Sequence, residues 1–379
     1  MSADAPKFVL AAGGTGGHLF PAQALAEQLT ARGAAVHLVT DRRSDALAAG
    51  MPGVAIARIR AGRIGGGPFH TACGLAMLAV GLVEARQLLR RLDPEAVVGF
   101  GGYPSVPTLW AATQLGFASV IHEQNAVLGR ANRLLARRVK RIATGFVETA
   151  RLRPADRARA VHTGNPVRPA IRAVARVPYR PPERGAPIEL LILGGSQGAR
   201  IFADVVPPAL AALPAGLRTA LRVSQQARPE DGERVAAQLR DAGIAAEISS
   251  FFGDVPDRLA RAQLVICRSG ASTVAELAAV GRPSFLVPYP HATDDHQAAN
   301  ARAIASAGAA WVLPQSALSA AMLANRLAER LADPAGLVYA AGQARRFAVD
   351  DAAQRLASLV WGLVPSVGTA GAKFAERAA

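Results

Sequence analysis

Cysteine is scarce in this sequence, with only Cys73 and Cys267 among 379 residues. Two cysteines exclude a disulfide framework and a four-cysteine zinc site, and they favour a reducing compartment. Aromatic residues are also few, at 5%. No helix-turn-helix, zinc-finger or RNA-binding signature is present, so nucleic acid is not expected as a partner. Charged residues make up 19% against 51% hydrophobic residues, which excludes a disordered or coiled-coil protein.

Long hydrophobic runs are missing as well. The longest, Ala72 to Val83, falls short of the roughly 18 residues of a membrane span and continues into Glu84 and Arg86. The polar segment from Met1 to Lys7 does not form a secretory signal. We therefore expect a protein that is soluble or lies on a membrane without crossing it. Acidic residues are few too: 43 basic and 28 acidic side chains give a net charge of +15, which indicates an anionic partner.

Short apolar or β-branched runs alternate with Ala-, Leu- and Arg-rich helical stretches along the chain. This alternation predicts an α/β fold with doubly wound parallel sheets that helices cover on both faces. The expected strands are Phe8–Ala11, Val36–Thr40, Ala96–Phe100, Ser119–His122, Arg141–Thr144, Glu189–Leu193, Thr219–Val223, Ala245–Ser249, Gln263–Cys267 and Ser284–Val287.

The chain also consists of two similar halves, in each of which an early strand leads into a glycine-rich turn, at Gly13–Gly17 and at Gly194–Gly198. A proline-rich stretch at 176–187 predicts a linker between them. We expect two Rossmann-like domains facing across a cleft. The expected boundaries are 1–167 and 168–345, with a helix at 346–364 packing back on the first domain and a disordered tail at 365–379.

The two glycine turns are candidate anion sites. Glycine lets backbone N–H groups approach a ligand, and the positive end of the following helix favours negative charge. A tight turn without a ligand is the alternative, although the presence of a second such turn favours a ligand. His18 follows the first turn, where the helix start favours a neutral imidazole that can accept a proton; a capping or packing role is equally compatible. Ser196 in the second turn offers a hydroxyl to a phosphate oxygen.

A third segment, 267–277, runs from a buried strand into a helix that starts with small residues. Glu276 lies about one turn into this helix, and its carboxylate suits the paired hydroxyls of a ribose. A capping role for Glu276 is the more common explanation of such a glutamate in isolation. Four consecutive polar residues at 122–125 leave another strand, which is typical of a site edge in open α/β sheets. Arg168 lies at the predicted domain junction, where it is placed to clamp a diphosphate.

The loop at 288–300 is dense in polar side chains. His291, Asp294, Asp295 and His296 are residue types that bind metals, but they share one short loop and no distant partner is evident. We therefore favour sugar recognition here, and we expect neither a metal nor another cofactor to be required.

A helix is expected from Ala72 to Leu92. Leu75, Ala79 and Leu82 share a face of it that continues to Arg86 and Arg90. Further basic residues follow without an acid between Glu123 and Glu148. An apolar strip with arginines at its rim fits docking on an anionic bilayer. A core helix beside a solvated basic face is the alternative, and it is the better default from these residues alone.

Six motifs in this order resemble those of the MurG family of bacterial glycosyltransferases. They are Gly-Gly-Thr-Gly-Gly-His at 13–18, Gly-Gly-Tyr-Pro-Ser at 101–105, His-Glu-Gln-Asn at 122–125, Gly-Asn-Pro-Val-Arg at 164–168, Gly-Gly-Ser-Gln-Gly-Ala at 194–199 and the segment from Pro-Tyr-Pro-His to Asp-Asp-His-Gln at 288–297. The resemblance implies a GT-B fold and an inverting transfer of GlcNAc from UDP-GlcNAc to the C4 hydroxyl of MurNAc in undecaprenyl-diphospho-MurNAc-pentapeptide. That reaction converts lipid I to lipid II in peptidoglycan synthesis.

The resemblance also implies a place in the cell and a set of site residues. A peripheral protein on the cytoplasmic face of the inner membrane is expected, with an anionic membrane surface and other cell-wall synthesis or division proteins as partners. The implied donor contacts are Phe252 for uracil, Glu276 for ribose, Ser196, Arg168, Ala271, Ser272, Thr273 and Val274 for the diphosphate, Asn125 and Gln297 for the sugar, and Thr15, Gly16 and Gly17 closing the cleft. The implied acceptor and membrane residues are Gly14, Tyr103, Leu75, Leu82 and Arg86.

His18 is the preferred general base, with Glu123 and His122 as alternatives. Two features depart from the family pattern: Ser224 to Ala227 stands where His-Gln-Thr-Gly is common, and Phe252 where an aliphatic residue is frequent. A UDP-GlcNAc 2-epimerase or hydrolase on the same fold remains an alternative function, as does a non-enzymatic peripheral lipid- or nucleotide-binding protein.

Overall fold

The computed structural model describes residues 5–13, 16–41, 51–62, 67–195 and 198–364. The chain forms two compact units, of which unit 1 comprises 1–168 and 351–379 and unit 2 comprises 169–350. The chain thus passes from one unit to the other twice, after Arg168 and after Asp350. The predicted boundaries, after residues 167 and 345, lie one and five residues earlier. The predicted tail at 365–379 lies outside the described residues.

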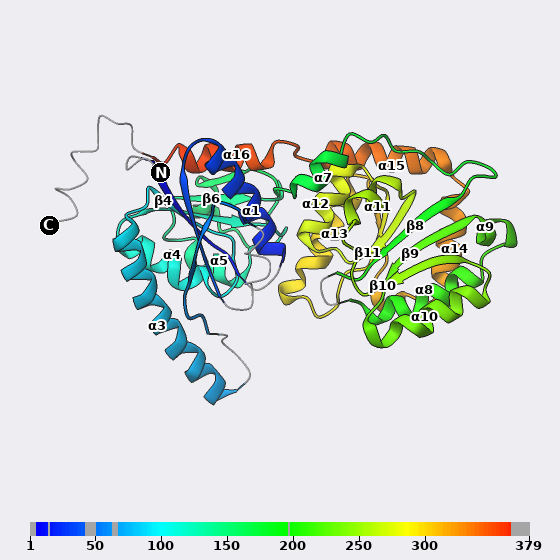
Figure 1. Cartoon of the computed structure of the whole chain (residues 1–379), viewed down its shortest axis with the longest axis horizontal. Helices are drawn as coiled ribbons and strands as arrows, with labels where there is room; N and C mark the ends of the chain where they lie inside the picture. Colours follow the sequence, from blue (N-terminus) through cyan, green and yellow to red (C-terminus); the bar gives the residue numbers. More distant parts are fainter. Residues whose placement is uncertain (1–4, 14–15, 42–50, 63–66, 196–197, 365–379) are drawn as a thin grey trace. The chain divides into compact units, whose positions relative to one another are not determined.

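Unit 1 contains a seven-stranded parallel sheet with the order β3-β2-β1-β4-β5-β6-β7 within the described residues (Figure 1). Its strands are β1 (Lys7–Ala11), β2 (Ala35–Thr40), β3 (Ala55–Arg58), β4 (Ala96–Gly99), β5 (Ala118–Glu123), β6 (Arg141–Thr144) and β7 (Ala160–His162). Its helices are α1 (Gly16–Ala31), α3 (Pro68–Leu92), α4 (Ser105–Gln114), α5 (Arg130–Leu135), α6 (Pro154–Arg157) and α16 (Ala352–Trp361).

Helices cover both faces of this sheet because its central strands are apolar on both sides. The residues of β1 alternate between two cores: Phe8 and Leu10 pack toward α1 and α16, whereas Val9 packs toward α3 and α4. The last helix, α16, belongs to unit 1 although the chain reaches it through unit 2. It completes the first core, where the ring centroids of Trp361 and Phe8 lie 5.5 Å apart.

In the described part of unit 2, six strands form a parallel sheet with the order β10-β9-β8-β11-β12-β13. Its strands are β8 (Ile188–Leu193), β9 (Leu221–Gln226), β10 (Ala245–Ser249), β11 (Leu264–Cys267), β12 (Ser284–Leu286) and β13 (Ala310–Val312). Its helices are α7 (Pro169–Val174), α8 (Arg200–Ala211), α9 (Ala215–Ala220), α10 (Pro229–Asp241), α11 (Val255–Arg261), α12 (Ala271–Val280), α13 (His296–Ser306), α14 (Ala320–Leu331) and α15 (Pro334–Phe347), with short 3-10 turns at Thr293–Asp295 and Gln315–Ala317.

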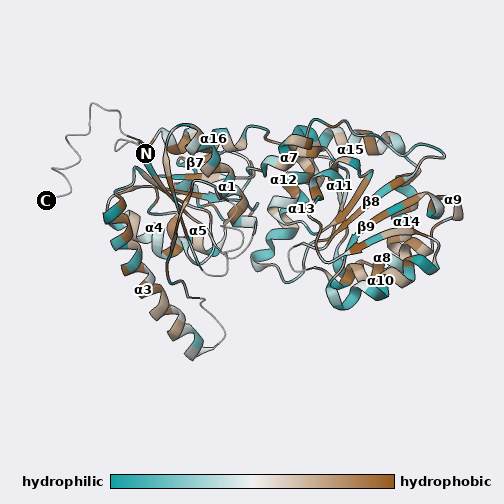
Figure 2. Ribbon diagram, viewed as in Figure 1, coloured by the Kyte–Doolittle hydropathy of each residue, from teal (hydrophilic) through white to brown (hydrophobic). Residues whose placement is uncertain are grey.

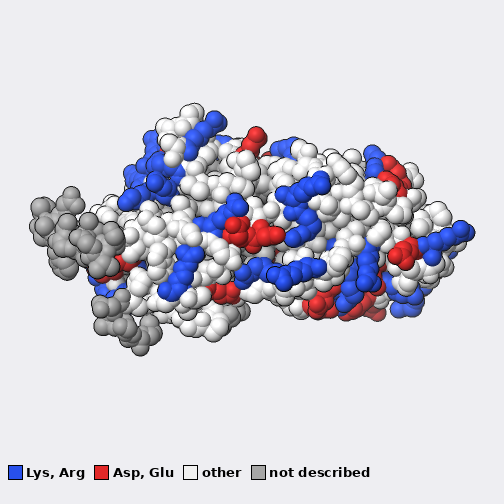
Figure 3. Space-filling model, turned by 90° about the horizontal axis from the view of Figure 1, so that it is seen from above, with Lys and Arg blue, Asp and Glu red and all other residues white. Residues whose placement is uncertain are grey.

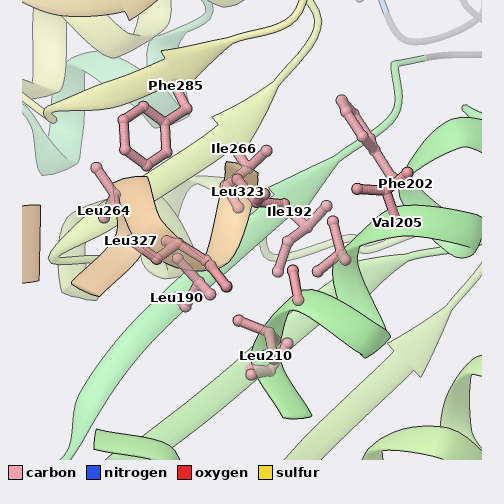
Figure 4. Close-up of a cluster of buried hydrophobic side chains, with 14 of the residues drawn as sticks. Leu190, Ile192, Phe202, Val205, Leu210, Leu264, Ile266, Phe285, Leu323 and Leu327 are labelled. Atoms are coloured by element: carbon pink, nitrogen blue, oxygen red, sulfur yellow. The ribbon is translucent and has the colours of Figure 1, made fainter. Parts of the chain in front are cut away.

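A large core of unit 2 lies between its sheet and helices α8, α10 and α14. Figure 4 shows Leu190 and Ile192 of β8 among side chains from α8 and α14, including Phe202 and Leu327. All four of these side chains are fully or almost fully buried. This apolar layer holds the strands of unit 2 in register, so that their carboxyl ends form one edge.

The predicted α/β class and the two parallel sheets are confirmed, and each predicted strand overlaps an observed one. Three short strands were missed: β3, β7 and β13 all lie at sheet edges, where a strand buries fewer residues and its apolar pattern is weaker. The predicted strand at Thr219–Val223 begins too early. Thr219 and Ala220 belong to α9, whose first turn follows Pro214, and β9 starts at Leu221.

Helix α3 differs most from its prediction. An 18-residue window within His70–Leu92 has a mean hydropathy of 1.5. By length and composition alone, the helix is therefore long and apolar enough to cross a membrane. This finding corrects the prediction that the apolar segment is too short for a membrane span. Figure 2 shows apolar residues along α3. Ala85 and Leu89 are nevertheless fully buried in the core of unit 1, which ties the second half of the helix to the fold.

The exposed apolar residues of α3 also differ from the predicted strip. Leu75 is 53% exposed and Val83 54%, and Met77 and Val80 are exposed as well. Leu82, in contrast, is partly buried and packs against the core of unit 1. The apolar surface is therefore centred on the first half of the helix and continues to Val80 and Val83. These two residues each follow directly after a residue of the predicted face, Ala79 or Leu82.

Candidate active site

Both glycine turns lie at the point where the strand order of their sheet reverses. In unit 1 this point is between β1 and β4, and in unit 2 it is between β8 and β11. Ligands of open α/β sheets bind outside the carboxyl ends of the strands at such a point. The order in unit 2 repeats that of the first six strands of unit 1, so the sequence repeat corresponds to a repeat in topology.

The loops after β1 and β4 touch through their glycines. Gly102 has φ +77°, and a Cβ atom on it would lie 2.5 Å from the carbonyl oxygen of Gly13. A Cβ atom on Gly13 would lie 2.7 Å from Cγ of Pro104. The buried hydroxyl of Ser105 lies 2.7 Å from the carbonyl oxygens of Ala11 and Gly101, and it ties the two loops together. Only glycine fits where backbone approaches backbone this closely.

His18 lies on the first turn of α1, against these loops. Its Nδ1 is 3.0 Å from the carbonyl oxygen of Gly13, and its ring faces Gly101, on which a Cβ atom would lie 3.1 Å from Nε2. A carbonyl can only accept a hydrogen bond, so Nδ1 carries the proton. In the neutral ring Nε2 is then the basic nitrogen, which is the state that a general base needs.

Replacing Gly102 with alanine should destabilise unit 1 more than the same change at Gly33. Both glycines have positive φ, but a Cβ atom on Gly33 would meet nothing within 4 Å. We expect Gly33→Ala to lower the free energy of unfolding by about 1 kcal/mol and Gly102→Ala by at least about 2 kcal/mol, because the second change adds a clash to the strain. Denaturant unfolding of both variants measures the difference, and equal losses would contradict the close approach of the two loops.

Glu123, at the end of β5, is almost fully buried and organises the loop that follows it. Its carboxylate accepts hydrogen bonds from the backbone N–H and Nδ2 of Asn125, from the backbone N–H of Gly129 and from Nδ2 of Asn132, at 2.8 to 3.1 Å. Four donors occupy the two oxygens of a carboxylate. The geometry therefore gives Glu123 a role in fixing Asn125, the predicted sugar contact, and argues against a role as the base.

His122 is fully buried beside it. Its Nε2 donates to the carbonyl oxygen of Gly164 at 3.1 Å, and its Nδ1 lies 3.0 Å from Nε2 of Gln124. Burial lowers the pKa of His122 to about 4. Nδ2 of Asn165 also donates a hydrogen bond to the carbonyl oxygen of Gln124, at 2.7 Å. His122 thus joins two of the sequence motifs, and both of its ring nitrogens face protein groups.

Other predicted residues of unit 1 lie around these loops. Gly16 and Gly17 start α1, and the guanidinium carbon of Arg168 lies 4.8 Å from the ring centroid of Phe20 on the same helix. Tyr103 follows Gly102, two residues before α4 begins, and is partly buried. The predicted residues Gly14 and Thr15 lie outside the described part of the chain, as does Ser196 in unit 2.

In unit 2, Gln226 at the end of β9 joins two loops of the carboxyl edge. Its Oε1 accepts from the backbone N–H of Gly194 at 3.1 Å, and its Nε2 donates to the carbonyl oxygen of Ser250 at 3.1 Å. The segment from Ser224 to Ala227, which departs from the family pattern, therefore supports the glycine turn after β8. Gly195 and Gly198 in this turn both have positive φ.

The switch point of unit 2 lies between β8 and β11. Helix α12 follows β11 and starts at Ala271. Its first turn contains Ala271, Ser272 and Thr273, and Gly270 precedes it without a side-chain cap. The hydroxyl of Ser272 is buried and has no hydrogen-bond partner among the described residues. Glu276 is buried further along the same helix, with Val274 in the core between them. Backbone N–H groups, an orphaned hydroxyl and a carboxylate are donors and acceptors that suit a nucleoside diphosphate.

The loop before α13 is fixed from several sides. Oε1 of Gln297 accepts from the backbone N–H of Tyr289 at 3.0 Å, and the backbone oxygen of Gln297 accepts from the hydroxyl of Ser269 at 2.8 Å. Asp294 and Asp295 both have positive φ, a strained conformation that is frequent at functional sites. Among the described residues, no group of three or more His, Cys, Asp and Glu could hold a metal ion. A reaction without metal stays a prediction.

Sequence reasoning missed the supports of this site. Asn300 is fully buried and bonds through Nδ2 to the carbonyl oxygen of Ser269 at 3.1 Å. Asn300 lies three residues after Gln297, so both are on one face of α13, and that spacing was a usable signal. Asn132, which donates a hydrogen bond to Glu123, offered no comparable signal in the sequence. The two residues are nine positions apart, and a loop and the start of a helix lie between them.

Comparison with known proteins identifies the family. Residues 8–144 match the glycosyltransferase family 28 N-terminal domain, and residues 189–356 match the glycosyltransferase family 28 C-terminal domain. The chain is 53% identical over 354 residues to the UDP-N-acetylglucosamine–N-acetylmuramyl-(pentapeptide) pyrophosphoryl-undecaprenol N-acetylglucosamine transferase of Rhodospirillum centenum, with 93% of each chain covered.

Solved structures agree with this match. MurG of Acinetobacter baumannii is 31% identical, with a TM-score of 0.76 over 94% of this chain and 100% of that one. A putative UDP-N-acetylglucosamine 2-epimerase of Listeria monocytogenes, at 13% identity and a TM-score of 0.65 over 94% of this chain and 96% of that one, shares the fold alone. The predicted GT-B type of fold is confirmed. The chain belongs to glycosyltransferase family 28, among the MurG enzymes.

Proposed function

We propose that this chain transfers GlcNAc from UDP-GlcNAc to the C4 hydroxyl of MurNAc in undecaprenyl-diphospho-MurNAc-pentapeptide, and so converts lipid I to lipid II. The observation that carries the proposal is the match over 93% of the chain to a transferase named for this reaction. The two glycine turns at the switch points support it, because both the donor and the acceptor contain a diphosphate.

Unit 2 holds the donor in this proposal. The first turn of α12, Ser272 and Ser196 bind the diphosphate, while Glu276 accepts hydrogen bonds from the ribose hydroxyls. Arg168, the last residue of unit 1, adds its charge to the diphosphate in this proposal. Gln297, whose Oε1 is fixed by the backbone N–H of Tyr289, offers its amide to the sugar. The backbone at Phe252, in the loop after β10, binds the uracil.

Unit 1 supplies the base and the acceptor loops. Nε2 of His18 takes the proton from the C4 hydroxyl of MurNAc as the oxygen of that hydroxyl bonds to the anomeric carbon of GlcNAc. The bond from that carbon to the UDP oxygen breaks, with inversion, and UDP leaves with the electron pair. The helix start at α12 and Arg168 stabilise the charge on the departing diphosphate.

The test is an assay of radiolabelled UDP-GlcNAc with and without a lipid I analogue. We expect UDP and a labelled lipid product in equal amounts, and both only when the acceptor is present. Release of UDP or conversion of the sugar without the acceptor would instead support the epimerase or hydrolase. Binding without any turnover in either condition would support a non-enzymatic protein.

We further propose that the exposed apolar surface of α3 docks the protein on the cytoplasmic face of the bacterial plasma membrane, where the lipid tail of its acceptor lies. Leu75, Met77, Val80 and Val83 form this surface. Helix α3 packs on α4 and α4 packs on α5, and the residues after α5 include the exposed cations Arg137 and Lys140. On the face that Figure 3 draws, Lys and Arg side chains are more widespread than Asp and Glu side chains, as the net charge of +15 implies. Apolar insertion beside positive charge favours an anionic bilayer.

The double variant Leu75→Asp/Val83→Asp should bind phosphatidylglycerol vesicles at least about tenfold more weakly, because each change replaces an inserted apolar side chain with a charge. Both side chains are exposed, so the fold should tolerate the changes. Vesicle sedimentation measures binding, and turnover of a short-chain soluble acceptor should stay unchanged. The control is Val147→Asp, on a valine of unit 1 that is even more exposed, at 80%. Vesicle binding equal to that of the unchanged protein would contradict the docking surface.

A further inference from the structure

Arg258 of α11 lies at the centre of a cluster beside the loop that follows β10. The guanidinium carbon of Arg258 is 4.1 Å from the ring centroid of Phe252, a distance at which cation and ring attract each other. The side chain of Arg258 is only 10% exposed, and Phe252 is buried. The ring of Phe252 therefore packs against the guanidinium and is shielded from solvent.

Three further groups fix the guanidinium in place. Nε of Arg258 donates to Asp254 at 2.8 Å, one terminal nitrogen donates to the hydroxyl of Ser224 at 2.7 Å, and both terminal nitrogens lie within 2.9 Å of the carboxylate of Glu247. Ser224 and Glu247 are direct partners on β9 and β10. The hydrogen bond from Arg258 also holds the pKa of Asp254 below its usual value.

The loop between these anchors is held at its other end as well. The hydroxyl of Ser249 donates to the carbonyl oxygen of Phe251 at 2.7 Å and accepts from the backbone N–H of Phe251. Gln226 binds the carbonyl oxygen of Ser250. Arg258 is thus the group that fixes the last part of the loop, at Phe252. A lysine could not replace it, because only a planar guanidinium stacks on a ring while donating to three partners.

We propose that Arg258 is a positioning residue that sets the backbone at Phe252 for recognition of the donor's nucleobase. This inference rests on the proposed function, in which the backbone at Phe252 binds the uracil. Arg258 touches no substrate. It acts through the ring of Phe252, and its loss leaves the diphosphate and ribose contacts in place. The affected quantities are the affinity for UDP-GlcNAc and the preference for uracil over other bases.

The test compares Arg258→Ala and Arg258→Lys with the unchanged protein. We expect both variants to raise the KM for UDP-GlcNAc by about tenfold, the loss expected for one buried cation–ring contact with its charged partners. The kcat at saturating donor should stay within about twofold, since the reacting atoms are untouched. The ratio of the inhibition constant of CDP to that of UDP should fall toward one, because a less ordered backbone at Phe252 discriminates less between the two bases.

The matched control is Arg261→Ala, on an exposed arginine of the same helix, which should change none of these quantities. An unchanged KM with an unchanged CDP to UDP ratio in Arg258→Ala overturns the inference. If Arg258→Ala does not fold, Phe252→Leu removes the same contact and must show the same two effects. The proposed function is tested separately by the unchanged protein, whose failure to form UDP with the lipid acceptor would reject that function regardless of the variants.

Discussion

Replacing His18 with glutamine is expected to lower kcat by about a hundred- to ten-thousandfold, the usual contribution of a general base. Glutamine can keep the donor to the carbonyl oxygen of Gly13 that Nδ1 of His18 provides, but its amide does not take up a proton. The donor KM should hardly change, because His18 is not among the proposed donor contacts, and those to the base and the ribose lie in unit 2. His18→Ala should lose a similar factor in kcat and, in addition, some stability of the loop.

Single-turnover kinetics with saturating donor and acceptor measure this loss at the chemical step. The matched control is His37→Ala, on a half-buried histidine in the middle of β2, which should leave kcat unchanged. Near-normal activity of His18→Gln would show that His18 only anchors the glycine turn. A different group would then have to take the proton, although Glu123 and His122 are already engaged by protein groups.

Replacing Glu276 with alanine should weaken the binding of UDP-GlcNAc by about 5- to 150-fold, or about 1–3 kcal/mol, through loss of charge-assisted hydrogen bonds to the ribose. Glu276 is buried on α12, so its carboxylate is screened little by water. Titration calorimetry with UDP measures the affinity, and turnover at saturating donor should change less than the KM.

A comparison of UDP with 2′-deoxy-UDP identifies the contact. The unchanged protein should bind the deoxy compound more weakly, whereas Glu276→Ala should bind both equally, because the missing hydroxyl has no partner left. Glu276→Gln is the matched variant of equal size. Its preference for UDP over 2′-deoxy-UDP should lie between that of the unchanged protein and that of Glu276→Ala. An equal penalty for the deoxy compound in the unchanged protein and in Glu276→Ala would contradict the ribose assignment and favour a role in capping α12.

The sequence predicted the fold well where burial is strongest. The central strands carry unbroken apolar runs such as Phe8–Ala11, and both glycine turns mark the switch points correctly. Edge strands such as β7 and β13 have three residues each and are not distinct in the sequence. On α3, the spacing of Leu75, Ala79 and Leu82 is that of one helical face, but the spacing alone could not say which face packs on α4.

The candidate site was predictable as motifs but not as roles. The residues of His-Glu-Gln-Asn at 122–125 are alike in the sequence, since each can bind a substrate. Their roles differ because β5 buries His122 and Glu123, whereas Asn125 lies beyond the strand. Hydrogen bonds such as those of Arg258 join residues up to 34 positions apart. Such partners depend on how strands and helices stack, which no local pattern encodes.

The return of α16 to unit 1 has a consequence for the order of folding during synthesis. Unit 2 is one continuous segment, so it can fold as soon as residue 350 has left the ribosome. Unit 1 emerges first, yet Leu356, Ala357 and Val360 of its core are made last. Until then the part of this core that α16 covers stays open to water. We therefore expect nascent chains that stop before α16 to recruit chaperones through this surface, although they already contain most of the catalytic loops.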